Sequence, residues 1–133
     1  MQRKRKERSP GEKENAEELK EVKALITEGK AHLDRGGEEE FELAVSAFSR
    51  GLTRCGPGSQ SALTNQLHHL RGLAQLRLRR FTEAEKDFQE AILTADDKSK
   101  IGFYSSLGKC RMEMAASGES NMVRLMLFRM KKQ

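Results

Sequence analysis

Apolar residues recur every three or four positions through most of the chain, and this spacing restricts the folds it can adopt. Such a period places the apolar residues on one face of an α-helix. Helix-breaking residues separate several of these segments, at Gly36-Gly37, Gly56-Pro57-Gly58 and Ser117-Gly118. No stretch shows the sustained alternation of apolar and polar residues that is typical of a β-strand. The sequence therefore predicts an all-α fold.

Several polar residues stand where helices are expected to begin. Ser59 or Ser61 would cap a helix through residues 63–76, and Asp96-Asp97 would open a later one. Thr82, with Glu85 three residues further on, matches a capping box and predicts the start of the helix between these two. Residues 121–131 are expected to form the last helix. We expect Glu38–Glu40 to lie in a loop, with their carboxylates in water.

Two parts of the chain resemble each other when Gly72 is placed on Gly29. The alignment then pairs Leu76 with Leu33, Phe81 with Phe41, Ala84 with Ala44 and Phe88 with Phe48. A small residue in the middle of a helix lets a second helix cross it closely, and the phenylalanines are expected to fill the space between helix pairs. Gly108 begins a third copy, whose second helix is degraded. One pair cannot bury this surface alone, so the pairs must stack.

The stretch from Leu70 to Ile92 resembles the tetratricopeptide repeat (TPR) family and fits its pattern of about 34 residues without a gap. The first copy fits with a short insertion at residues 37–40 and the third over one helix, so the resemblance covers residues 20–116. It implies a right-handed α-α superhelix of about two and a half helical hairpins, occupying residues 16–118. His68 departs from the pattern, because the family usually has a large apolar residue there.

The net charge of +5 is concentrated at the two ends of the chain. Residues 1–8 and residues 121–133 each carry +4, which leaves −3 for residues 9–120. A nucleic-acid-binding domain would carry its excess charge on the folded part, so nucleic acid is disfavoured as a partner. We expect residues 1–15 to be a disordered basic tail. The tail contains a basic cluster, Arg3, Lys4, Arg5 and Lys6, with Arg8 beside it. This cluster is either simply solvated or acts as a nuclear-import patch or electrostatic tether.

Composition and spacing argue against an enzyme. With 36% apolar residues, 5% aromatic residues and no Trp, the chain can bury a thin core but cannot line a deep catalytic cavity. His68 and His69 point about 100° apart on a helix, so they are not expected to form a metal site with His32. Cys55 and Cys110 have no paired histidine and are interpreted as structural thiols. We therefore expect no catalytic residue, no cofactor and no metal.

The cellular location follows from what the sequence lacks. No apolar run approaches the ~18–20 residues that a bilayer span needs. Residues 1–6 are not followed by the apolar stretch of a secretory signal. We therefore expect a protein of the cytoplasm, the nucleus or both.

The resemblance implies a function in binding, because in TPR proteins the first helix of each hairpin lines a concave groove that holds peptides. The groove-facing positions map to Lys23, Ile26, Lys30, His69, Leu73, Arg77, Lys109 and Met112. Cations mixed with apolar side chains favour a protein or peptide partner with carboxylates and a few large apolar residues.

One TPR subclass grips the carboxylate tails of chaperones with a Lys–Asn–Asn–Lys–Arg clamp. None of the matching positions has the required residue type; they are Ile26, Lys30, Leu70, Gly102 and Ser106. A chaperone C-terminal tail is therefore disfavoured as the partner.

The C-terminal segment is rich in methionine, since five of the six methionines fall between Met112 and Met130. We expect residues 119–133 to form a helix that caps the stack. Alternatively this helix binds a partner, a second copy of the chain or an acidic membrane, or fills the chain's own groove.

The sequence as a whole favours a non-catalytic adaptor that binds a protein or peptide through its helical hairpins. The alternative is a nuclear accessory factor whose basic tails contact nucleic-acid phosphates while the repeats serve as a scaffold. A salt titration distinguishes the two, because phosphate-driven binding falls steeply with salt.

Overall fold

A computed structural model of the chain describes residues 10–56, 62–117 and 129–130, with side chains from residue 16 onward. Over residues 10–117 it has these helices: α1 (Pro10–Arg35), α2 (Glu38–Cys55), α3 (Ala62–Arg77), α4 (Phe81–Leu93) and α5 (Asp97–Ser117). No strand occurs among the described residues, which confirms the all-α fold.

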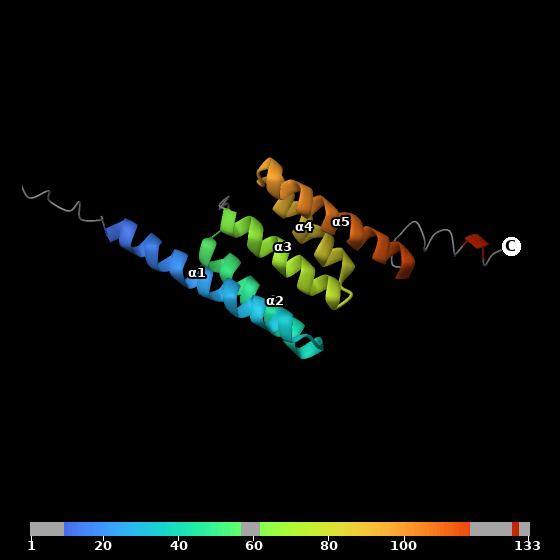
Figure 1. Ribbon diagram of the computed structural model, residues 1–133, viewed down its shortest axis with the longest axis horizontal. Coiled ribbons are helices and arrows are strands. Elements are labelled where there is room, and N and C mark those ends of the chain that lie inside the picture. The colour runs from blue at the N-terminus through green and yellow to red at the C-terminus, as the bar shows by residue number, and fades with distance from the viewer. Residues whose placement is uncertain (1–9, 57–61, 118–128, 131–133) are drawn as a thin grey trace, which may run out of the picture.

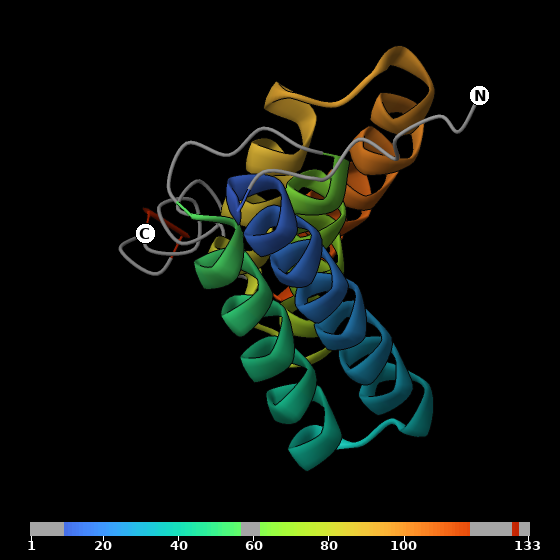
Figure 2. The same ribbon diagram turned by 90° about the vertical axis from the view of Figure 1, so that its left-hand side faces the viewer.

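Consecutive helices pack against each other in antiparallel pairs. α1 packs on α2 and α3 on α4, while α2 contacts α3 and α4 contacts α5. In Figure 1, α1, α3 and α5 run in the same direction across the molecule, and α2 and α4 return between them. Figure 2 shows α1 and α2 side by side in front, with the later helices behind them. Since α1 also touches α3, and α3 touches α5, these three helices form one continuous layer.

Glycines lie at the closest approach within each of the first two pairs, as the sequence predicts. A Cβ atom on Gly29 would come within 2.3 Å of the Phe48 ring, and one on Gly72 within 2.6 Å of the Phe88 ring. Gly108 differs, because no atom of the described residues lies within 4 Å of its Cβ position. The crossing expected at Gly108 is therefore absent from the described part, which ends α5 at Ser117 and gives the third pair no second helix.

Two apolar clusters form the core. The first joins α1, α2 and α3 around Phe48 and Leu67, and the second joins α3, α4 and α5 around Phe81 and Phe88. These four side chains are fully buried. Phe41, which was expected to share this role, is only half-buried.

Two sequence expectations about where helices begin can be compared with the structure. α4 begins at Phe81 rather than Thr82, and no side chain caps it, so the predicted capping box is wrong. The turn before it sets this start: the Ala84 amide already donates to the Arg80 carbonyl at 3.0 Å. α5 does begin at Asp97, where the Asp96 carboxylate accepts from the Ser99 amide at 2.8 Å, which holds the pKa of Asp96 below its usual value. Ser59 and Ser61 lie outside the described residues.

Glu38–Glu40 form the first turn of α2 instead of a loop, where carboxylates interact favourably with the helix dipole. α1 begins at Pro10, inside the segment expected to be disordered. Proline is favoured in the first turn of a helix because its missing N–H would be unpaired there anyway. The disordered tail predicted for residues 1–15 is therefore wrong from residue 10 onward, and residues 1–9 lie outside the described part.

Candidate functional site

The layer of α1, α3 and α5 carries all the residues predicted to face a groove. Those that are exposed in the structure are Lys23, Lys30, Arg77, Lys109 and Met112. No ion pair involves any of these four cations among the described residues. This contrasts with the α2 arginines, since Arg50 and Arg54 each pair with a glutamate of α1. These four exposed cations therefore have no ion-pair partner in the described part of the chain.

Ile26 is a correction to the predicted groove. Its side chain is only 5% exposed and lies in the first apolar cluster with Val22 and Phe48. Val22 and Ile26 are one helical turn apart, so they share the face of α1 that packs inward. Ile26 contributes to stability and is not available to a ligand.

His69 and Leu73 lie on the layer, but their side chains pack against other parts of the fold. The His69 Nε2 atom is 2.9 Å from the Ser106 hydroxyl, and its ring stacks at a tilt on Phe103 at 4.7 Å between centroids. Burial lowers the pKa of His69 below its ordinary 6.5, so the ring is neutral near pH 7. Leu73 packs against the second apolar cluster. His69 thus joins α3 to α5 and is not the free groove side chain that we expected.

The structure brings Arg77 and Lys109 together, although they are 32 positions apart. Both line a cavity of about 420 Å³ between the C-terminal end of α3 and the second half of α5. The other lining residues are Leu76, Arg79, Glu113, Ala116 and Ser117. Sequence reasoning missed Arg79 and Glu113, because Arg79 lies in a turn and repeat periodicity says nothing about turns. Lys23 and Lys30, on α1, are not part of this cavity.

A buried charged network fixes α3 against its neighbours. Asp87 of α4 is only 3% exposed and accepts two parallel hydrogen bonds from Arg71, at 2.9 and 2.6 Å. His68 Nδ1 lies 3.2 Å from the same carboxylate, and Arg71 also donates to the Ser49 hydroxyl of α2. His68 therefore stands in place of the usual apolar residue because it partners Asp87. The network holds the middle of the layer in register.

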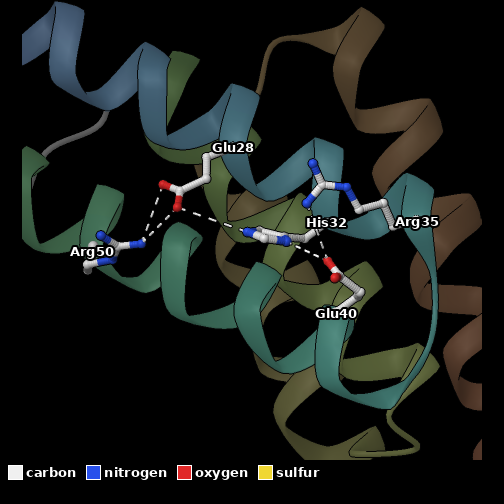
Figure 3. A network of polar contacts seen from close by, with 5 residues as sticks. All are labelled: Glu28, His32, Arg35, Glu40 and Arg50. Carbon is white, nitrogen blue, oxygen red and sulfur yellow. Dashed lines mark hydrogen bonds and ion pairs between the residues drawn. The ribbon is translucent and has the colours of Figure 1, made fainter.

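A second polar network joins α1 and α2, as Figure 3 shows. His32 lies between two carboxylates, with Nδ1 2.6 Å from Glu40 and Nε2 4.0 Å from Glu28. Glu28 also accepts from Arg50, and Arg35 lies 3.9 Å from Glu40. Most of these groups are substantially exposed, so each pair is worth about 0–1 kcal/mol. The network tightens the first hairpin.

The two cysteines show no sign of a reactive or metal-binding role in the described part of the chain. Cys110 is buried, its thiol donates to the Phe81 carbonyl oxygen, and burial with nearby Glu85 and Glu113 raises its pKa to about 11. Cys55 and Cys110 are both free thiols. Among the described residues, no three His, Cys, Asp or Glu side chains converge as metal ligands would.

A second cavity, of about 470 Å³, lies at the other end of α3. Its lining includes Thr94, which donates to the Asn65 side chain, and Asp96, which caps α5.

The basic run from Arg3 to Lys6 and most of residues 119–133 lie outside the described part. Within that part, no helix has the length and apolar character needed to span a membrane. A scan against protein-family models and searches of curated proteins and of solved structures found no match to this chain.

Proposed function

We propose that this protein is a non-catalytic adaptor of the cytoplasm or nucleus, built from about two and a half TPR hairpins, that binds a protein or peptide on the layer of α1, α3 and α5. The single observation that supports this is the set of exposed cations on this layer, Lys23, Lys30, Arg77 and Lys109, none with an ion pair among the described residues. The hairpin register also fits, because Gly29 and Gly72 occupy the crossings that the repeat pattern requires.

The partner is expected to supply carboxylates and one or two large apolar side chains. Exposed ion pairs contribute only about 0.2–1 kcal/mol each, so the cations would orient the partner and raise its association rate. Met112 offers the apolar contact, since its flexible side chain is 74% exposed and adapts to different shapes. The same reasoning predicts moderate affinity that weakens with salt.

The test is to compare partners recovered from cells by the whole chain and by a charge-reversed variant, Lys30→Glu with Arg77→Glu. A control variant reverses an exposed lysine outside this layer, Lys86→Glu on α4. We expect the first variant to lose partners that the control retains, with both variants equally helical by circular dichroism. If the first variant recovers an unchanged set of partners, the layer is not the binding surface.

A further inference from the structure

The cavity at the C-terminal end of α3 is lined by more positive than negative charge. Arg77, Arg79 and Lys109 contribute three cations, and Glu113 contributes one carboxylate. The formal charge of the lining is therefore +2. Leu76 and Ala116 supply apolar wall beside these groups.

The two arginines of this cavity differ from the others in the helical body. Within residues 16–56 and 62–117, the arginines with a carboxylate within 4.0 Å are Arg35, Arg50, Arg54, Arg71, Arg80 and Arg111. Arg77 and Arg79 have no such partner in that part of the chain. The unpaired guanidinium groups therefore lie together at one place.

Arg79 also adopts a backbone conformation that favours glycine. Its φ angle is +61°, and it is the only residue other than glycine with a positive φ in the described part. The turn closes α3 through bonds from the Arg79 amide to the Leu76 carbonyl at 3.0 Å and from the Arg80 amide to the Gln75 carbonyl at 2.8 Å. Glycine would occupy this position without steric cost. A residue other than glycine in this conformation is a reason to ask what its side chain does.

The Arg79 side chain is held in position by an aromatic ring. Its guanidinium carbon lies 5.4 Å from the centre of the Phe81 ring, a cation–π distance. Phe81 is buried, so it is a rigid support for the cation. The cavity thus has the oriented guanidinium of Arg79, the guanidinium of Arg77 from the last turn of α3, and the ammonium of Lys109 from α5.

We propose that this cavity binds an oxyanion, the carboxylate or phosphate of an acidic or phosphorylated peptide side chain. Guanidinium groups bind both anions through paired N–H donors, and the net charge of +2 suits either. The cavity lies between α3 and α5, two helices of the binding layer, so this proposal deepens the proposed function. That the oxyanion belongs to a peptide rests on the proposed adaptor function. Glu113 weakens the binding of any anion by like-charge repulsion.

The test uses the full-length chain and three small probes: N-acetyl-glutamate methylamide, N-acetyl-phosphoserine methylamide and, as a neutral control, N-acetyl-glutamine methylamide. The arginine Nε–Hε signals in nuclear magnetic resonance spectra report the site directly. We expect both anionic probes to shift the Arg77 and Arg79 signals saturably, and the neutral probe to leave them unchanged. The stronger of the two anionic probes identifies the source of the oxyanion.

Four variants, one of them a control, sharpen the result. Arg77→Gln should weaken the anionic probes about fivefold or more, and Glu113→Gln should strengthen them about twofold. Arg79→Gly should also weaken them while keeping or raising the urea midpoint of unfolding, since glycine relieves the backbone strain. Lys86→Gln removes the same charge from exposed α4 and should change the binding by less than about twofold.

The proposal is overturned if neither anionic probe shifts the two signals, if the neutral probe shifts them equally, or if Lys86→Gln weakens binding as much as Arg77→Gln. These outcomes are independent of the partner comparison in cells. Probe binding with an unchanged set of partners would reject the adaptor function and keep the site. Lost partners without probe binding would reject the oxyanion site and keep the adaptor function.

Discussion

Replacing Gly29 with alanine tests whether close helix crossing holds the hairpins together. The new Cβ would lie 2.3 Å from Cε1 of Phe48 and 2.6 Å from its Cζ, whereas ordinary contacts begin near 3.4 Å. The ring or one helix must therefore move by about 1 Å. Phe48 is fully buried, and protein interiors are close-packed, so a displaced ring meets other side chains.

The expected cost follows from two opposing terms. Overpacking of this kind costs about 1–3 kcal/mol. Alanine is more favourable than glycine in a helix interior by about 1 kcal/mol. Because the clash at Gly29 is severe, we expect a net loss of about 1–2 kcal/mol. This corresponds to a fall in Tm of about 3–10 °C for a chain of this size.

Urea unfolding followed by circular dichroism at the helical band measures this loss. Gly108→Ala is the matched control, because its Cβ meets no atom of the described residues within 4 Å. That variant should gain about 0.5–1 kcal/mol from helix propensity. The reasoning fails if Gly29→Ala is as stable as the parent chain, or if both substitutions destabilise equally.

Three further outcomes are expected. Asp87→Asn should destabilise the fold by about 2–4 kcal/mol in urea unfolding, because Arg71 then loses the buried carboxylate that it pairs with. An unchanged urea midpoint of unfolding would show that the pair is dispensable. Burial lowers the pKa of His69, so as the pH falls through 6.5 the unfolded chain binds a proton before the folded chain does. The free energy of unfolding should therefore decrease below that pH, and it should decrease less in His69→Gln. Parallel pH profiles of the two proteins would contradict this. Cys110, with a pKa of about 11, should not react with a thiol reagent at about pH 8 until the protein unfolds, whereas half-buried Cys55 should react faster. Equal reaction rates of the two thiols in the folded protein would contradict the burial of Cys110.

The main features of the fold could be predicted because they depend on local spacing. Helical periodicity gives the all-α fold, and the repeated Gly–Phe spacing places Gly29 and Gly72 at their crossings. Helix starts were harder to predict. The start of α4 depends on the turn around Arg79, and no propensity rule expects an arginine in that glycine conformation.

The candidate site could be predicted only in part, because periodicity identifies a helix face but not its exact edge. Lys30 is on the exposed side of α1, whereas Ile26, one turn earlier, lies in the core. His69 was expected on the surface, yet it contacts Ser106, which is 37 positions away. Pairings between helices, including the one that places Arg77 beside Lys109, depend on how the hairpins stack and are invisible in a single sequence.

Site-specific photocrosslinking in cells tests the proposed binding surface most directly. A photoreactive phenylalanine analogue would replace Lys30 or Met112 on the layer of α1, α3 and α5, and Lys86 or Glu90 on the exposed face of α4. The proposed adaptor function predicts protein adducts from the first two positions and none from the α4 positions. Adducts of equal strength from α4, or none from Lys30 and Met112, would contradict it.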